Sequence, residues 1–368
     1  MEQGMRALVM AAGGTGGHVY PAVAVARAWL ARHPGDRIVF LGTERGLERT
    51  AVPREGFELR PLPARGVVGK NPLAALRGLW SAAMSFKKSR TLLGEIRPVA
   101  VLGAGGYASF APTLAACTLG IPTLVLEVNR TLGLANRILK KFADATTVSF
   151  EETLQDAGPR AHWTGTPVRA LGEPAREHEK FGLLIVGGSQ GAESLNRMMQ
   201  HAAPLLAPHA SRLFVIHMRG RGKGEELESA YESAGLEARV VEYIKDMAWA
   251  YAQADLVVAR AGATTLAELA FLGKPAVLIP FPHAAGHHQR DNALAFERAG
   301  AAHMLDPDAG GQSLEEAGAS LAEAIVSMLE NPERLRLMQS RSRSLGQPGA
   351  AERVVEILEK LAGAKGRV

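Results

Sequence analysis

One local pattern occurs twice in the chain: a short apolar strand that ends in a glycine-rich turn and continues into a helix. The first copy runs through RALVMAA at 6–12 and GGTGGH at 13–18, and the second through GLLIV at 182–186 and GGSQGAESLN at 187–196. The two turns lie 174 residues apart. Buried strands that alternate with helices are typical of a parallel sheet covered on both faces. The sequence therefore predicts an α/β fold with two similar doubly wound domains.

Further apolar runs continue the pattern in both halves. The additional expected strands lie at 37–41, 99–102, 123–126, 212–216, 238–242, 256–259 and 276–279. We expect an N-terminal Rossmann-like domain at 1–165 and a C-terminal Rossmann-like domain at 181–345, joined by a Pro- and charge-rich linker at 166–180. Residues 346–368 hold a last helix that could pack on either domain.

Composition excludes several classes of protein. The 368 residues are 47% hydrophobic and 21% charged, which is enough apolar material for a core in each half. Cys117 is the one cysteine, so an intrachain disulfide and a zinc site built on two cysteines are excluded, and a cytoplasmic setting is expected. The longest uncharged run, 98–126, is broken by glycines and prolines, and the N-terminus lacks the apolar stretch of a signal peptide. We therefore expect neither a membrane span nor export.

Basic charge is concentrated in one segment. The formal net charge is +5, yet residues 60–90 hold seven basic residues and no acidic one. A helix is expected over 71–90, and its apolar face with basic margins could be core or could enter the headgroup region of an anionic membrane. The lack of acidic residues favours the membrane. The residues of this expected membrane and acceptor face are Leu73, Leu76, Arg77, Leu79, Trp80, Met84, Phe86, Lys87 and Lys88.

The first glycine turn predicts an anion site, because backbone N–H groups and the helix dipole favour negative charge there. Binding of a nicotinamide dinucleotide would need an acidic residue at the end of the second strand. Asp36 precedes that strand and Glu44 follows it late, which disfavours this interpretation. His18 follows the glycines at the helix start, where a neutral imidazole could accept a proton, although a histidine that only packs at the turn has the same position.

Other polar clusters have two interpretations each. Thr265 and Glu268 have the spacing of a capping box, but a carboxylate at that place could also hold the hydroxyls of a ribose. His283, His287 and His288 include a pair at i, i+4 that suggests a metal, yet no carboxylate cluster is near in sequence. The run 306–308 has the form of an Asp-x-Asp metal site, but its proline indicates a turn. We expect no metal.

Over nearly its whole length the sequence resembles the MurG family of peptidoglycan glycosyltransferases. The resemblance is carried by MAAGGTGGHVYPAVAVA, VLGAGGYASFAP, GTPVR, LLIVGGSQGA, ARAGATTLAELAFLGKPAVLIPFP and HHQRDNA, in this order. It implies a GT-B fold with the active site in the cleft between two Rossmann-like domains. It also implies inverting transfer of N-acetylglucosamine from UDP-N-acetylglucosamine to the 4-hydroxyl of the N-acetylmuramyl unit of lipid I, which gives lipid II. No cofactor is implied.

The resemblance also implies roles for particular residues. His18 would be the general base, Glu268 would bind the ribose hydroxyls, Ile244 would meet uracil, and Asn129 would touch the donor sugar. The run LEVNR at 126–130 departs from the family's H-E-Q-N and a small residue, which predicts altered contacts to the donor sugar. The full set of expected contacts to UDP-N-acetylglucosamine is Thr15, Gly16, Gly17, Asn129, Arg169, Ser189, Ile244, Arg260, Ala263, Thr264, Thr265, Leu266, Ala267, Glu268 and Gln289.

The expected partners follow from the same resemblance. They are the UDP-N-acetylglucosamine donor, the lipid I acceptor and the anionic inner leaflet, so the protein would lie peripherally on the cytoplasmic face of the plasma membrane. Proteins of cell-wall synthesis and division are candidate partners. Other classes of protein fit the sequence less well. A UDP-N-acetylglucosamine 2-epimerase would have no use for a basic apolar face, and a dehydrogenase would need the missing acid. A nucleic-acid binder would not explain the two glycine turns, so no nucleic acid is expected.

Overall fold

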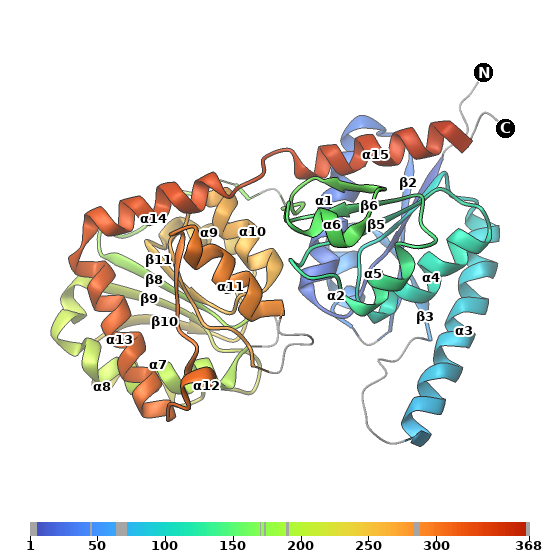
Figure 1. The fold of residues 1–368 in the computed structure, drawn as a ribbon. Coiled ribbons are helices and arrows are strands. Elements are labelled where there is room, and N and C mark those ends of the chain that lie inside the picture. Colours follow the sequence, from blue (N-terminus) through green and yellow to red (C-terminus); the bar gives the residue numbers. More distant parts are fainter. Residues whose placement is uncertain are drawn as a thin grey trace. The chain divides into compact units, whose positions relative to one another are not determined.

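Each half of the chain builds its own parallel sheet, and the computed structural model divides into two units (Figure 1). Unit 1 comprises Met1–Arg169 and Gln347–Val368, and unit 2 comprises Ala170–Gly346. The structure describes residues 6–44, 46–63, 72–169, 171–172, 174–188, 191–282 and 288–365, with the backbone alone described at 72–77, 79 and 365.

The sheet of unit 1 has the strand order β3-β2-β1-β4-β5-β6-β7, with parallel neighbours throughout. Its strands are β1 (Ala7–Ala11), β2 (Arg37–Thr43), β3 (Glu58–Leu62), β4 (Ala100–Gly103), β5 (Thr123–Glu127), β6 (Ala145–Val148) and β7 (Ala161–Trp163). Its helices are α1 (Gly16–Arg32), α2 (Glu48–Arg54), α3 (Pro72–Ile96), α4 (Tyr107–Thr118), α5 (Leu134–Leu139), α6 (Thr153–Ala157) and α15 (Ala350–Lys365). Strands β1, β4 and β5 are buried at every residue, because helices cover a parallel sheet on both faces.

The sheet of unit 2 repeats this arrangement with the order β10-β9-β8-β11-β12-β13. Its strands are β8 (Phe181–Val186), β9 (Leu213–Met218), β10 (Glu237–Val241), β11 (Leu256–Ala259), β12 (Ala276–Leu278) and β13 (Ala302–Met304). Its helices are α7 (Glu193–Leu206), the 3₁₀ helix η1 (Ala207–Arg212), α8 (Leu227–Ser233), α9 (Met247–Gln253), α10 (Ala263–Leu272), α11 (His288–Arg298), α12 (Pro307–Gly310), α13 (Leu314–Glu330) and α14 (Pro332–Ser344). The expected doubly wound architecture is confirmed in both units.

Each sheet has one point at which the strand order reverses. It lies between β1 and β4 in unit 1 and between β8 and β11 in unit 2. Ligands of doubly wound sheets bind outside the carboxyl ends of the strands at this switch point. In unit 1 the switch point is flanked by the glycine turns at 13–17 and 104–106, and in unit 2 by the segments at 187–188 and 260–262.

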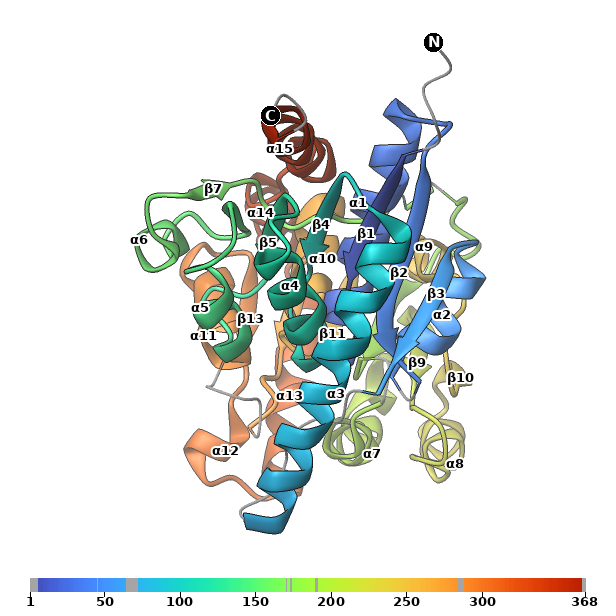
Figure 2. The same ribbon diagram turned by 90° about the vertical axis from the view of Figure 1, so that its right-hand side faces the viewer.

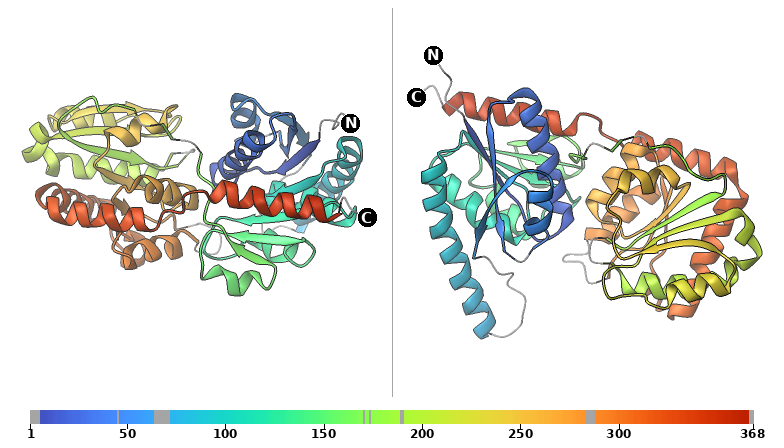
Figure 3. Two further views of the ribbon diagram at one scale, coloured as in Figure 1. Left: turned by 90° about the horizontal axis from the view of Figure 1, so that it is seen from above. Right: turned by 180° about the vertical axis from the view of Figure 1, so that it is seen from behind.

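The C-terminal helix α15 packs on unit 1, beside α1 (Figure 3). Its side chain Leu358 is buried. Arg353 donates to the carbonyl oxygen of Thr164 at 2.7 Å, and Glu359 Oε1 lies 2.7 Å from His33 Nε2. The helix therefore completes the N-terminal half of the fold although it comes last in the chain.

The second half of the expected linker at 166–180 is bound to unit 2. Arg176 forms a bidentate ion pair with Asp255, at 2.9 Å from Nη1 to Oδ1. The backbone N–H of Glu177 donates to Gln253 Oε1 at 2.7 Å, and Trp249 Nε1 donates to Glu177 Oε1 at 2.8 Å. Unit 2 accordingly begins at Ala170, before the expected domain boundary.

Helix α3 runs beyond its expected end and lies beside α4 (Figure 2). Trp80 is 71% exposed and Met84 is 43% exposed. Phe86 instead packs against a core cluster that includes Leu93 and Val101, so its assignment to the membrane face is corrected. Lys87 and Lys88 are exposed, whereas the side chains of Leu73, Leu76, Arg77 and Leu79 lie outside the described residues. Over the described residues, the helices are too short or too polar to cross a membrane.

Candidate functional site

At the switch point of unit 1, His18 joins the two glycine turns. Its Nδ1 lies 3.0 Å from the carbonyl oxygen of Ala104, which follows β4. Gly105 and Gly106 have φ angles of +89° and +78°, and a Cβ on Gly105 would stand 2.9 Å from His18 Nδ1. Glycine is therefore required there by both the backbone conformation and the approach of the imidazole ring.

The contact with Ala104 sets the tautomer of His18. A carbonyl oxygen can only accept, so Nδ1 must carry the hydrogen that it donates. In the neutral ring Nε2 is then the basic nitrogen, with a lone pair that can take up a proton. The imidazole is half-buried rather than enclosed in the core. The ring therefore packs at the turn, as one of the two interpretations of His18 predicts, and its role as a base stays a prediction.

A buried carboxylate lies beneath the first glycine turn. Glu48 Oε2 accepts from the N–H of Gly14 at 2.9 Å, and Oε1 accepts from the N–H of Thr43 at 2.8 Å and from its hydroxyl at 2.6 Å. A Cβ on Gly13 would stand 2.4 Å from Glu48 Oε1. One N–H of the turn expected to receive an anion is therefore already bound to a carboxylate of the protein. Sequence reasoning missed Glu48, which no local pattern distinguishes.

A second buried carboxylate, Glu127, shapes the loop after β5. It accepts from the backbone N–H groups of Asn129 and Gly133, both at 2.9 Å, and from Nδ2 of Asn129 at 3.1 Å. Asn136 Nδ2 donates to Glu127 Oε2 at 2.9 Å, while Asn136 Oδ1 is buried without a hydrogen-bond partner among the described residues. The amide nitrogen of Asn129 is thus engaged by Glu127, and Val128, where the family has Gln, is buried.

The other expected residues of unit 1 lie near the start of α1. Thr15 is the N-cap residue, is exposed and caps the helix with no side-chain hydrogen bond. Gly16 and Gly17 form the first turn of α1. The Arg169 guanidinium lies 4.8 Å from the ring centroid of Tyr20, which is a residue of α1. Tyr107 is the first residue of α4, and a Cβ on Gly14 would lie 3.4 Å from its ring. Sequence reasoning missed this tyrosine.

At the switch point of unit 2, Arg260 is a buried cation. It donates to the carbonyl oxygens of Ile279 at 3.0 Å and Pro280 at 2.7 Å, and to the hydroxyl of Ser194 on α7. Its Nε is buried without a partner among the described residues. Burial lowers the pKa of Arg260, against an opposing through-space effect of Asp308. A buried guanidinium held by neutral oxygens is suited to bind an anion.

Helix α10 starts at Ala263, three residues after Arg260. Its N-cap residue is Gly262, and no side chain caps the helix, so the capping-box interpretation of Thr265 and Glu268 is wrong. Thr264 Oγ1 is buried and has no hydrogen-bond partner among the described residues. An uncapped helix start beside a buried cation is a favourable place for a diphosphate.

The remaining expected residues of unit 2 have different surroundings. Glu268 is buried on α10 and accepts from the hydroxyl of Tyr251 at 2.8 Å. Gln289 Oε1 accepts from the backbone N–H of Phe281 at 3.0 Å. Ile244 packs in the core, as does Leu266, and its expected contact with uracil stays a prediction. Ala263 and Ala267 belong to α10, whereas Ser189, His283 and His287 lie outside the described residues.

The structure shows what the acidic residues Asp306 and Asp36 do. Asp306 caps α12 by accepting from Ala309 N–H and pairs with Arg290, which confirms the turn at 306–308. Asp36 is held by Arg6 and by Trp29 Nε1 at 2.9 Å, away from the carboxyl end of β2. Within the described ranges, no three His, Cys, Asp or Glu side chains gather as metal ligands would.

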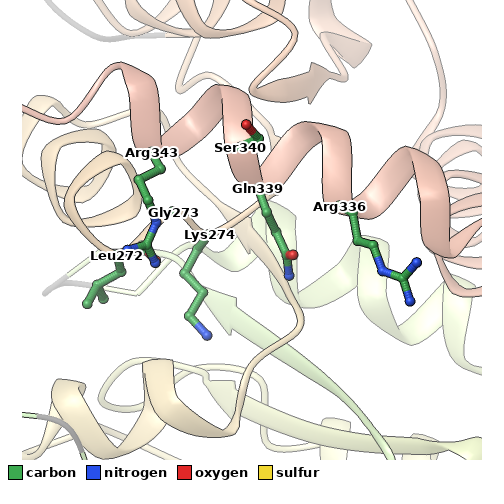
Figure 4. Close-up of a pocket in the computed structure, with 7 residues that line it drawn as sticks. All are labelled: Leu272, Gly273, Lys274, Arg336, Gln339, Ser340 and Arg343. Atoms are coloured by element: carbon green, nitrogen blue, oxygen red, sulfur yellow. The ribbon is translucent and has the colours of Figure 1, made fainter.

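A cavity of about 340 Å³ lies at the other end of α10 (Figure 4). Its lining residues are Leu272, Gly273, Lys274, Arg336, Gln339, Ser340 and Arg343. Lys274 Nζ donates to the carbonyl oxygen of Ala254 at 2.7 Å, and burial lowers its pKa. Lys274 precedes the amino end of β12, and the lining residues 336–343 lie on α14. The cavity is therefore not at the carboxyl ends of the strands, where the switch-point site lies.

Comparison with known proteins identifies the class. The glycosyltransferase family 28 N-terminal domain matches residues 8–148, and the family 28 C-terminal domain matches residues 182–354. The chain is a glycosyltransferase: it belongs to family 28 and has the two-domain GT-B fold.

Named relatives show which glycosyltransferases the chain is similar to. A protein of Anaeromyxobacter sp. (strain Fw109-5) is 42% identical over 360 residues, which cover 96% of this chain and 93% of the relative. It is named UDP-N-acetylglucosamine--N-acetylmuramyl-(pentapeptide) pyrophosphoryl-undecaprenol N-acetylglucosamine transferase. A protein of the same name from Pelobacter propionicus is 40% identical, over 95% of this chain and 98% of the relative. The crystal structure of Acinetobacter baumannii MurG is 29% identical with a TM-score of 0.73, over 96% of this chain and 99% of that one. The resemblance expected from the sequence is confirmed.

Proposed function

We propose that the chain transfers N-acetylglucosamine from UDP-N-acetylglucosamine to the 4-hydroxyl of the N-acetylmuramyl unit of lipid I, with inversion, and so makes lipid II for peptidoglycan. Relatives that match nearly the whole chain carry the name of this transferase. In the structure, the observation that carries the proposal is the hydrogen bond from His18 Nδ1 to Ala104, because it makes Nε2 the basic nitrogen.

Unit 2 supplies the donor contacts. The diphosphate of UDP lies at the start of α10, where the N–H groups of the first turn and the buried Arg260 meet its negative charge. The carboxylate of Glu268 accepts hydrogen bonds from the ribose hydroxyls, and Tyr251 fixes its orientation. The backbone at Ile244 contacts uracil, and Gln289 reaches the sugar.

Unit 1 supplies the acceptor contacts and the base. As the 4-hydroxyl attacks the anomeric carbon, His18 Nε2 takes its proton, a role that typically contributes ~10²- to 10⁴-fold in rate. The positive charge that forms on the ring is stabilised by the carbonyl oxygen of Ala104, which accepts from Nδ1–H. Glu127 and Asn136 hold the loop that carries Asn129 beside this site.

The leaving UDP gains negative charge, which Arg260 and the start of α10 neutralise without a metal ion. We therefore propose a reaction that needs no metal or other cofactor. The polyprenyl acceptor requires a membrane, and Trp80 and Met84 with the exposed Lys87 and Lys88 support peripheral binding to an anionic inner leaflet. Proteins of cell-wall synthesis and division are the candidate partners there.

The direct test is release of UDP from UDP-N-acetylglucosamine with and without a lipid I analogue, in the presence of EDTA. We expect release that depends on the acceptor and survives the chelator. UDP release without acceptor dependence would reject the proposed transfer. Loss of release on EDTA addition, restored by a divalent metal, would reject the metal-free mechanism and leave the transfer itself standing.

A further inference from the structure

The cavity at the carboxyl end of α10 lies outside the site already described, and we call it the α14 cavity. Arg336, Gln339, Ser340 and Arg343 line it from one face of α14, because residues three and four apart are neighbours on a helix surface. Lys274 lines it from the turn after α10 (Figure 4). Its volume of about 340 Å³ is within the range of ligand pockets, roughly 300–1,000 Å³.

The lining of the α14 cavity is cationic. Of the seven lining residues that the structure describes, three are cations, Lys274, Arg336 and Arg343, and none is acidic. Leu272 supplies the one large apolar side chain among them. Residues 334–351, which include most of α14, hold four basic residues and no acidic one. This lining disfavours an apolar ligand or a cation and favours an anion.

The acidic residue that acts on Lys274 is already neutralised. Asp255 pairs with Arg176 through both carboxylate oxygens, and its Oδ2 also accepts from the N–H of Gly182 at 2.8 Å. Burial is the main influence on the pKa of Lys274 and lowers it. Asp255 raises this pKa, whereas Arg176 and Arg343 lower it again. The cavity therefore has an excess of positive charge, which a bound anion would offset.

The protein uses only part of the hydrogen-bonding capacity of these cations. Arg343 Nη2 donates to the carbonyl oxygen of Leu272 at 3.0 Å, and Lys274 Nζ donates to that of Ala254 at 2.7 Å. A guanidinium has five N–H donors and an ammonium has three, so most donors remain for a ligand. The guanidinium of Arg336 has no partner in the part of the chain that the structure describes.

The two walls of the α14 cavity are fixed to each other. Ser342 is buried and donates from its hydroxyl to the carbonyl oxygen of Leu269 on α10 at 3.1 Å. Gly273 ends α10 with a φ of +66°, and a Cβ there would stand 2.8 Å from Arg343 Nε. The glycine thus lets the guanidinium lie against the turn. Because both walls are held in place, a ligand would meet a preformed site.

We propose that the α14 cavity binds a small phosphorylated anion, whose phosphate oxygens lie between Lys274, Arg336 and Arg343. A guanidinium matches pairs of phosphate oxygens with its parallel N–H groups, and the ammonium adds a compact charge. The site is distinct from the start of α10, because the ten residues of this helix span about 15 Å. Binding in the cavity does not depend on the proposed transfer reaction.

The test is calorimetric titration of the full chain with inorganic diphosphate, in the presence of saturating UDP to fill the proposed donor site. We expect one diphosphate per chain, bound more tightly than inorganic phosphate and more weakly as ionic strength rises. Arg336→Gln/Arg343→Gln changes two exposed side chains and should raise the Kd at least about tenfold. Diphosphate should also raise the Tm of the parent and leave the Tm of this variant unchanged.

The matched control is Arg334→Gln/Arg341→Gln. It removes the same charge from the same helix at residues that do not line the cavity, and it should change the Kd by less than about twofold. Equal weakening by both double variants would overturn the proposal, because the general field of α14 would then account for binding.

Two other outcomes are separable. Absence of diphosphate binding by the parent would overturn the proposal, and binding of a polyglutamate peptide in its place would assign the cavity to an acidic protein segment. Failure of UDP to bind would instead reject the proposed function. The comparison of the two double variants, titrated with diphosphate alone, would still decide what the α14 cavity binds.

Discussion

His18 Nδ1 and the carbonyl oxygen of Ala104 lie 3.0 Å apart, so one side chain ties helix α1 to the turn after β4. Unit 2 has a counterpart at the same place in its own sheet, where Arg260 after β11 donates to Ser194 on α7. In both units a polar side chain bridges the two segments that flank the switch point. In one unit this side chain is suited to move a proton, and in the other to hold an anion.

Replacing His18 by Asn tests the base without removing the bridge. The Asn amide nitrogen can take the place of Nδ1 and donate to Ala104, but the side chain has no basic nitrogen. We expect kcat to fall by ~10²- to 10⁴-fold with donor binding retained. His18→Ala should lose the bridge as well and be no more active. Steady-state kinetics with calorimetric titration of UDP-N-acetylglucosamine make the comparison, and near-normal turnover by His18→Asn would exclude His18 as the base.

Gly105→Ala should disturb the same ring from the other side. The new Cβ would stand 2.9 Å from His18 Nδ1, and the φ of +89° is unfavourable for alanine, at a cost of about 1 kcal/mol or more. We expect lower thermal stability and lower kcat. Gly94→Ala is the control, because Gly94 is on helix α3 with open space around its Cβ position and should gain ~0.5–1 kcal/mol in unfolding free energy. Equal effects of the two changes would show that the contact with His18 is unimportant.

Glu48→Gln should weaken the support of the first glycine turn while keeping the side-chain shape. The amide can accept from either Gly14 or Thr43 through its one oxygen, and its NH₂ group then faces another donor. We expect a loss of about 1–3 kcal/mol in the free energy of unfolding, measured by urea denaturation. A variant as stable as the parent would mean that the turn does not depend on this carboxylate.

Glu268→Gln should separate nucleotide recognition from catalysis. The amide can still accept from Tyr251, but the ribose hydroxyls lose a charged acceptor, worth about 1.5–3 kcal/mol. We expect KM for UDP-N-acetylglucosamine to rise by about tenfold or more with a smaller change in kcat. Glu228→Gln, on the exposed side of α8, is the matched control and should leave KM and kcat unchanged. A normal KM would remove Glu268 from the donor site.

His217 predicts how stability changes with pH. It is buried between the Tyr231 hydroxyl at 2.7 Å and Asn196 Oδ1 at 3.2 Å, and burial lowers its pKa from 6.5 to about 3. The folded state therefore holds the neutral ring while the unfolded chain takes up a proton. This contribution to stability is present above pH 6.5 and is lost as pH falls toward 3, by ~1.4 kcal/mol per pH unit. Urea unfolding across this range should show a steeper loss for the parent than for His217→Gln, and equal slopes would contradict the assignment.

The expected strands match β1, β2, β4, β5 and β8 to β12, whereas β3, β6, β7 and β13 were not expected. Strands β1 and β11 are continuous apolar runs because both faces of the sheet are covered. Strand β3 was missed because its residues ELRPL combine charges with a proline, as an edge strand allows. Strand β13 was missed because it has three residues, two of them only partly buried.

Some residues of the candidate site could be predicted from the sequence and others could not. The glycine turns and His18 could be found because local backbone requirements leave a mark in the sequence. Glu48 and Tyr251 could not, because each reaches the site from an element that is adjacent in space alone. The Thr265 and Glu268 spacing indicated a capping box, but α10 begins at Ala263, which places Thr265 inside the helix.

The place of α15 has a consequence for the order in which the chain can fold during synthesis. Unit 2 is one continuous segment and has all its residues once Gly346 has been made. Unit 1 covers α1 with a helix that begins at Ala350, so the segment made first must wait for a segment made after the whole of unit 2. Until α15 is made, the apolar surface of unit 1 that Val354, Val355 and Leu358 cover stays open to water or to a chaperone. Unit 2 therefore has its whole core available during synthesis before unit 1 does.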